Sequence, residues 1–128
     1  MMVLVDTSVW IRFLAGREPY ASGLDELLGR DEVVGHDMIF GELLIGDVGG
    51  GRKPLVDTYS QMHHAANVPH EEVVEFVRMR RLGGRGVGWV DIHVLASAVI
   101  GGFQFWTADR RLSVLARELG LAYSLAPL

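Results

Sequence analysis

Residues 1–10, MMVLVDTSVW, place a single carboxylate, Asp6, between a short apolar run and two hydroxyl side chains. Residues 2–5 are all apolar, which predicts a short buried strand. From residue 8 to residue 14 the apolar side chains recur at helical spacing, which predicts a helix directly after the turn. The chain therefore opens with a strand, a turn that carries a charge, and a helix.

Strands and helices are expected to alternate along the whole chain. The expected strands are at residues 2–5, 33–34, 103–107 and 121–125, with a weak strand or turn around residue 68. The expected helices are at residues 8–14, 21–28, 37–45, 54–64, 71–82, 90–100 and 110–119, with glycine loops at 49–51 and 83–88. Short strands without a polar face are typical of a parallel sheet covered on both sides. We therefore predict an α/β fold with three layers, α/β/α, around a short, mostly parallel sheet.

Length and composition indicate one soluble domain. The chain has 128 residues, no cysteine and no apolar run long enough to cross a bilayer, so we expect neither a disulfide scaffold nor a membrane protein. The first residues lack the basic start of a secretory signal, and we expect a cytoplasmic location. The net charge is -4, but arginines cluster at residues 78–85 and 110–111. Such clusters can bind phosphate even in an acidic protein.

Four acidic residues are predicted to meet at one edge of the sheet. Asp6 and Asp109 follow predicted strands, and the carboxyl ends of parallel strands lie at the same edge. Asp91 opens the helix that should be most deeply buried, and Glu42 lies among apolar neighbours within another helix. Carboxylate oxygens are the ligands that suit Mg²⁺ or Mn²⁺. A divalent metal site is one interpretation of this set.

Helix capping is the alternative for three of these acids. Asp6, Asp91 and Asp109 stand where helices are expected to begin, and a capping aspartate stabilises a helix by about 1 kcal/mol. Glu42 lies inside a helix and cannot cap it, and a buried carboxylate without a partner is costly. Glu42 therefore requires either an arginine or a metal ion.

The motifs of several other enzyme classes are absent. The sequence has no cysteine, no Gly-x-Ser-x-Gly, no P-loop, and no Gly-x-Gly-x-x-Gly after a strand. The five histidines, at positions 36, 63, 64, 70 and 93, do not have the spacing of zinc ligands. A phosphate-accepting receiver domain has a similar length, but it requires a lysine after a late strand, and the only lysine is Lys53.

Four segments together resemble the acidic motifs of the PIN domain, in the order and spacing of VapC-type toxins. They are VDTSVW (5–10), GELLIG (41–46), WVDIHVLASA (89–98) and WTADRRL (106–112). The resemblance covers almost the whole chain and implies a single PIN domain over residues 1–128. It further implies a metal-dependent endoribonuclease, the toxin of a toxin-antitoxin pair, which cleaves tRNA or ribosomal RNA and is inhibited by a VapB-type antitoxin.

The resemblance also implies roles for individual residues. Asp6, Glu42, Asp91 and Asp109 would be the metal ligands and catalytic residues, with Mg²⁺ or Mn²⁺ as cofactor. The hydroxyls of Thr107 and Ser8 would orient a carboxylate or a metal-bound water. Many PIN domains have a further acid or histidine two residues after the fourth acid, whereas this sequence has Arg111, which speaks against a second stable metal site.

RNA and protein contacts are expected around these acids. Arg85, Arg110 and Arg111 would draw in the RNA backbone, and Trp89 or Trp106 would either stack on an unpaired base or pack in the core. The apolar stripe of Trp10, Phe13 and Leu14 would serve a homodimer or an antitoxin helix, or would pack inward. The rival functions are a PIN nuclease of RNA processing or DNA cleavage without an antitoxin, and a PIN-like binding module without catalysis.

Overall fold

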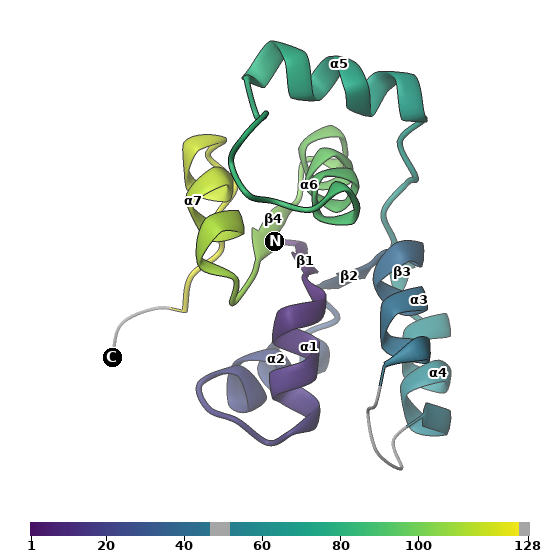
Figure 1. Cartoon of the computed structure of the whole chain (residues 1–128). Coiled ribbons are helices and arrows are strands. Elements are labelled where there is room, and N and C mark those ends of the chain that lie inside the picture. Colours follow the sequence, from purple (N-terminus) through teal and green to yellow (C-terminus); the bar gives the residue numbers. More distant parts are fainter. Residues whose placement is uncertain (47–51, 126–128) are drawn as a thin grey trace.

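The computed structural model describes residues 1–46 and 52–125 and contains one parallel sheet (Figure 1). Its strand order is β3-β2-β1-β4. The central strand pairs on both sides, Val3 lying opposite Val33 in one neighbour and opposite Gln104 in the other. The strands are β1 (Val3–Val5), β2 (Val33–Gly35), β3 (His63–His64) and β4 (Gln104–Trp106).

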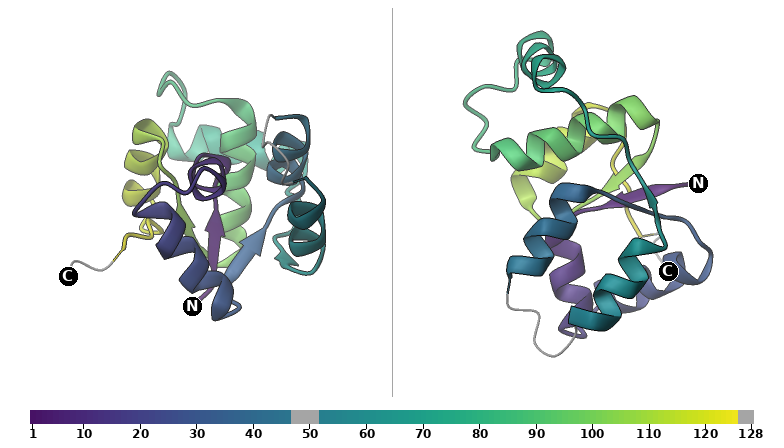
Figure 2. Two further views of the ribbon diagram at one scale, coloured as in Figure 1. Left: turned by 90° about the horizontal axis from the view of Figure 1, so that it is seen from below. Right: turned by 90° about the vertical axis from the view of Figure 1, so that its right-hand side faces the viewer.

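Helices cover both faces of the sheet. On one side lies α6, with α5 packed over it, and on the other side lie α1 and α2 (Figure 1, Figure 2). The predicted three-layer α/β/α fold is thereby confirmed. The helices are α1 (Thr7–Leu14), α2 (Tyr20–Gly29), α3 (Asp37–Ile45), α4 (Arg52–Ser60), α5 (His70–Arg80), α6 (Trp89–Gly101) and α7 (Arg110–Glu118).

The central strand and α6 form the middle of the core. The side chains of β1 are at most 1% exposed because the strand has a neighbour on each side and helices on each face. In α6 every residue from Ile92 to Ala98 is buried, as the apolar composition predicts. This helix ends at Gly102, whose φ of 70° is a left-handed conformation that glycine adopts without steric cost. Among the residues described, no helix is both long and apolar enough to span a membrane.

The prediction of one helix over residues 54–64 is wrong at its C-terminal end. The helix there, α4, begins at Arg52 and ends at Ser60, and the two histidines that follow it form strand β3 instead. His63 lies opposite Val34 and His64 opposite Gly35 in the adjacent strand. Such a short strand exists because a neighbouring strand offers it hydrogen bonds, and it leaves no periodic signal in the sequence.

Two other expected strands are reduced or absent. No strand forms around Val68, which packs as a buried residue ahead of α5. Residues 121–125 make a single parallel bridge, in which Ala122 lies opposite Phe105. Two backbone hydrogen bonds hold it, because Phe105 donates to Leu121 and Tyr123 donates to Phe105, each at 2.8 Å. The glycine loop expected at residues 49–51 lies outside the described residues.

Candidate active site

The four predicted acids come from four elements that end or begin at the same edge of the sheet. Asp6 directly follows β1, and Asp109 follows β4 just before α7. Glu42 lies in α3, the helix that follows β2, and Asp91 lies in the first turn of α6. Since the strands are parallel, their carboxyl ends bring these segments together (Figure 1).

Asp6 is buried and is held by two hydroxyl groups. Its side chain is 4% exposed. One carboxylate oxygen, Oδ2, accepts hydrogen bonds from Ser8 Oγ at 2.7 Å and from Thr107 Oγ1 at 2.8 Å. Asp6 stands at the N-cap position of α1, yet its side chain makes no capping hydrogen bond. Helix capping therefore does not explain this residue.

The same two hydroxyls connect the start of α1 to the loop before α7. Ser8 Oγ lies 3.2 Å from Thr107 Oγ1 and accepts the backbone N–H of Ala108 at 2.9 Å. Thr107 Oγ1 accepts the backbone N–H of Asp109 at 3.0 Å. These contacts fix the Asp6 carboxylate relative to the backbone that carries Asp109.

Glu42 takes its hydrogen bond from a residue that sequence reasoning did not assign to the site. Thr7 Oγ1 donates to Glu42 Oε1 at 2.7 Å, across 35 positions of sequence. Within the described part of the chain, Glu42 makes no ion pair with an arginine or lysine. The signal for Thr7 was present in the sequence as the first of two hydroxyl residues after Asp6.

The pKa of Asp91 shows that the charges of the other three acids act on it. Burial, and then the nearby carboxylates of Asp6, Glu42 and Asp109, raise the pKa of Asp91 to about 6. The N-cap of α6 is Gly88, so Asp91 is the third residue of the helix, within its first turn, and is not the capping residue. All four predicted acids therefore share one electrostatic neighbourhood.

Asp109 has a structural role of its own. It is exposed, and its Oδ1 accepts the backbone N–H of Leu112 at 3.0 Å. This is the capping bond of α7, so the capping interpretation describes this residue. One oxygen of the Asp109 carboxylate thus accepts a hydrogen bond from α7. Asp109 is related to the other acids through its charge, which contributes to the raised pKa of Asp91.

The carboxylate oxygens of the four acids suit a hard divalent cation, although these side chains do not yet surround a common point. Among residues 1–46 and 52–125, no three acidic or histidine side chains approach closely enough to hold a metal ion as they stand. The donors nevertheless are oxygen atoms only, as Mg²⁺ and Mn²⁺ prefer. Burial first, and then repulsion from the other three carboxylates, raise the pKa of Asp91, and a cation would relieve the repulsion. By their chemistry the residues fit the ion.

The three arginines predicted to meet RNA have different surroundings. Arg110 and Arg111 are exposed at the start of α7. The Nη1 atom of Arg111 lies 3.5 Å from the carbonyl oxygen of Gly86, in the loop that leads to α6. Arg85, in the same loop, pairs with Glu118 at 2.8 Å. Arg85 is therefore partly engaged within the protein, whereas Arg110 presents its charge to solvent.

A buried histidine beside the acids was not singled out from the sequence. His36, 1% exposed, lies between β2 and α3, and its Nδ1 accepts the backbone N–H of Met38 at 3.1 Å. Its Nε2 lies 3.0 Å from Ser97 Oγ in α6, and Ser97 donates to the carbonyl of His93. Burial is the main cause that lowers the pKa of His36. This neutral side chain ties α3 to α6.

Comparisons with known proteins identify the family and the fold. The family model described as the PIN domain matches residues 3–118. Two curated relatives, each named ribonuclease VapC32, come from the CDC 1551 / Oshkosh and ATCC 25618 / H37Rv strains of Mycobacterium tuberculosis. Each is 41% identical over 122 residues, which is 94% of this chain and 95% of the relative. The crystal structure of PAE2754 from Pyrobaculum aerophilum superimposes with a TM-score of 0.60 over 94% of this chain and 90% of that one. At 19% identity, that likeness shows the fold alone.

Proposed function

The chain belongs to the PIN domain family, and from this premise we propose that it is a metal-dependent endoribonuclease, the toxin of a VapBC-type pair. The relatives named ribonuclease VapC32 support RNA as the substrate. The observation that carries the proposal is the electrostatic neighbourhood of Asp91, whose pKa is raised by burial and by three further carboxylates. Strongly shifted pKa values of this kind cluster at functional sites.

The proposed cofactor is Mg²⁺ or Mn²⁺. Asp6, Glu42, Asp91 and Asp109 would hold it, and when bound it would lower the pKa of a water and neutralise charge on the phosphate. Because Arg111 stands where a further acid would be needed, we propose one stable ion rather than two.

The hydroxyl residues of this chain would orient the acids. Ser8 and Thr107 hold one oxygen of Asp6 and leave the carboxylate in a single orientation. Thr7 does the same for Glu42. Fixed donors reduce the rearrangement needed when the substrate binds.

Positive charge near the acids would attract the RNA backbone, which the carboxylates alone would repel. Arg110 and Arg111 are exposed immediately after Asp109 and are suited to contact phosphates. Arg85 would contribute through the loop before α6, where its guanidinium already pairs with Glu118. Structured RNA such as tRNA or ribosomal RNA is the proposed substrate class, by resemblance to the family.

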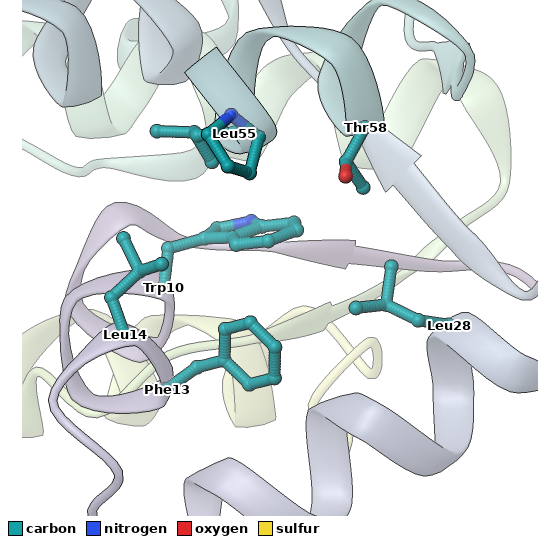
Figure 3. A pocket seen from close by; sticks show the side chains of 7 residues that line it. Trp10, Phe13, Leu14, Leu28, Leu55 and Thr58 are labelled. Atoms are coloured by element: carbon teal, nitrogen blue, oxygen red, sulfur yellow. The ribbon is translucent and has the colours of Figure 1, made fainter. Parts of the chain in front are cut away.

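A groove on the opposite end of α1 is the proposed seat of the antitoxin (Figure 3). It has a volume of about 170 Å³ and is lined mainly by apolar side chains of α1, α2 and α4. Trp10 forms its floor and is buried, as the inward-packing alternative predicts, whereas Leu14 at its rim is 37% exposed. An apolar groove between helices suits an amphipathic helix of a partner. A homodimer is also proposed, by family resemblance.

The rival without catalysis, a PIN-like module that retains the acids as helix caps, is disfavoured by two residues. Asp6 makes no capping bond, and Asp91 stands three residues after Gly88, which is the N-cap of α6. Capping explains only Asp109 among the four acids.

RNA cleavage tests the proposed function directly. Purified protein should cleave tRNA or ribosomal RNA in the presence of Mg²⁺ or Mn²⁺, and chelator should abolish the cleavage. Asp6→Asn and Asp91→Asn should each remove it, while Asp57→Asn, in the exposed part of α4, should cleave like wild type. Cleavage that requires zinc, or that survives Asp6→Asn and Asp91→Asn, would refute the proposal.

A further inference from the structure

The three tryptophans of the chain have very different environments. Trp10 is 1% exposed and Trp106 is 4% exposed, whereas Trp89, at the start of α6, is 44% exposed. Trp106 packs between the rings of Tyr20 and Tyr123. The structure therefore assigns Trp106 to the core and leaves Trp89 with an indole surface that a ligand can reach.

Two histidine rings hold the exposed indole of Trp89. His93, one helical turn further along α6, lies edge-to-face with it at a centroid distance of 5.0 Å. His70, the first residue of α5, contacts it in a T-shaped arrangement at 5.6 Å. Because aromatic pairs of this geometry attract one another, the indole is restrained although it is exposed. A restrained ring loses little conformational freedom when a ligand stacks on it.

Trp89 is also close to the acidic site along the chain. It lies two residues before Asp91, in the same turn of α6. Gly88 precedes both, and its backbone passes close to the Asp91 carboxylate, since a Cβ atom there would lie 3.8 Å from Oδ2. At helical spacing the two side chains point to different sides of a helix that is about 10 Å across. Trp89 and Asp91 therefore share the N-terminal end of α6 but not a face of it, and an RNA strand that crosses this end of the helix would place one nucleotide at Asp91 and another at Trp89.

We propose that Trp89, supported by His93 and His70, is a stacking platform for an unpaired base of the RNA substrate, at the same end of α6 as Asp91 but on another face of the helix. The inference rests on the proposed ribonuclease function and adds a position that favours single-stranded RNA. Proteins recognise unpaired bases by stacking them on aromatic rings, and one such stack typically changes affinity by about 1–3 kcal/mol.

An RNA base suits this surface better than a protein helix does. Of the two imidazoles beside the indole, His70 is exposed and can donate or accept a hydrogen bond at the edge of a base, whereas His93 is 8% exposed and supports the ring from within the protein. The apolar groove of α1, α2 and α4, by contrast, is lined by aliphatic and aromatic carbon with one threonine. The groove offers a partner helix an apolar surface, whereas the indole of Trp89 stands at the end of α6 that also carries Asp91.

Tryptophan fluorescence provides a direct test because Trp10 and Trp106 are buried. The Asp6→Asn protein, which should bind RNA without cleaving it, is titrated with single-stranded oligoadenylate and with the oligoadenylate–oligouridylate duplex. We expect the single strand to quench the emission and the duplex to quench it less. Binding is measured in parallel by the anisotropy of labelled oligoadenylate.

Variants of the platform separate stacking from folding. In the Asp6→Asn background, Trp89→Leu should bind oligoadenylate roughly tenfold more weakly or worse, whereas Trp89→Phe should retain most of the affinity. Ile100→Ala, at an exposed apolar residue near the other end of α6, should bind unchanged. Equal melting temperatures of these proteins would show that the loss is not a folding defect.

The platform is overturned if oligoadenylate binds by anisotropy while the emission stays unchanged, or if Trp89→Leu binds as well as the parent. It is also overturned if Trp89→Leu leaves RNA binding intact but loses a protein partner. If only the stacking hypothesis is wrong, the wild-type protein still cleaves RNA. If the proposed ribonuclease function is wrong, the wild-type protein does not cleave RNA. The two failures are therefore distinguishable.

Discussion

Thr7 Oγ1 donates a hydrogen bond to Glu42 Oε1 at 2.7 Å and so links the first residue of α1 to the middle of α3. A hydrogen bond to a charged group is worth about 1.5–3 kcal/mol. Glu42 has no arginine or lysine partner within the described residues. The threonine hydroxyl is therefore what holds this carboxylate toward the other acids.

We predict that Thr7→Val slows RNA cleavage by about tenfold or more, because Glu42 loses its orientation. Thr7→Ser keeps a hydroxyl at the same position and should recover most of the rate. Cleavage rates at saturating Mg²⁺ measure the effect, with thermal melting to verify folding. Ser60→Ala, which removes an exposed hydroxyl of α4, is the matched control. Equal rates for Thr7→Val and wild type would exclude a positioning role for Thr7.

The second prediction concerns the charge of Asp91 in metal-free protein. Burial and the neighbouring carboxylates raise its pKa to about 6 in the folded protein, from a usual value of 3.8. The folded state thus favours the protonated acid, so the stabilisation is fully present below pH 3.8 and is lost as pH rises through 6. The full shift corresponds to roughly 3 kcal/mol, which screening at this half-exposed site reduces to about 1–2 kcal/mol.

Asp91→Asn should therefore melt a few degrees higher than wild type at about pH 8 in chelator, while abolishing activity. Near pH 4 the gain should disappear, because the wild-type acid is then protonated. Calorimetry or circular dichroism at the two pH values measures the difference. An Asn variant that melts like wild type at both values would show that the acids do not repel one another.

Metal binding should stabilise the folded protein. We expect millimolar Mg²⁺ or Mn²⁺ to raise the melting temperature of wild type, since an ion that binds only the folded state shifts the equilibrium toward it. Asp91→Asn should respond much less, and Asp57→Asn should respond like wild type. A wild-type melting temperature that is insensitive to both ions would argue against a metal site.

The buried imidazole of His36 predicts a loss of stability in acid. Its pKa is lowered from the usual 6.5, mainly by burial. The stabilisation is present above 6.5 and is lost as pH falls through the folded-state pKa. Protonation would also place a proton on Nδ1, which accepts the N–H of Met38. His36→Asn can still cap α3 but does not titrate. Its free energy of unfolding, by urea denaturation, should fall less than that of wild type between about pH 7 and pH 5.

The groove beside α1 predicts where an antitoxin binds. If the adjacent short reading frame encodes the partner, the two proteins should co-purify after co-expression. Leu14→Asp, at the half-exposed rim, should weaken this complex because it places a charge against an apolar surface. Ile100→Asp, at an exposed residue far from the groove, should leave it intact. If the complex forms equally well with Leu14→Asp, the antitoxin binds to another surface of the protein.

Local sequence patterns were sufficient for most of the fold. The apolar run before Asp6 and the apolar residues of α6 correspond to the central strand and the most buried helix. The strand and the helix could both be predicted because an apolar run and helical periodicity are patterns of neighbouring residues. The four acids were also singled out from the sequence, because each lies in a short motif, and in the structure the other three lie near enough to Asp91 to contribute to its raised pKa.

Only the tertiary structure decided which of several local possibilities each residue takes. His63 and His64 became a strand because β2 offered them hydrogen bonds, and residues 121–125 kept only one bridge to β4. Trp89 is exposed and Trp106 is buried, although each is the first residue of one of the four acidic motifs. These outcomes depend on contacts between segments far apart in the chain, which no local pattern encodes.

The sequence by itself indicated most of the element types, the alternation of strands and helices, and the four acids that we propose for catalysis. The tertiary structure decided how those acids are held: Asp6 by Ser8 and Thr107, Glu42 by Thr7, and Asp109 as the cap of α7. Helical and strand periodicity are properties of neighbouring residues, whereas a hydrogen bond between α1 and α3 exists only after β1 and β2 have paired and aligned their carboxyl ends.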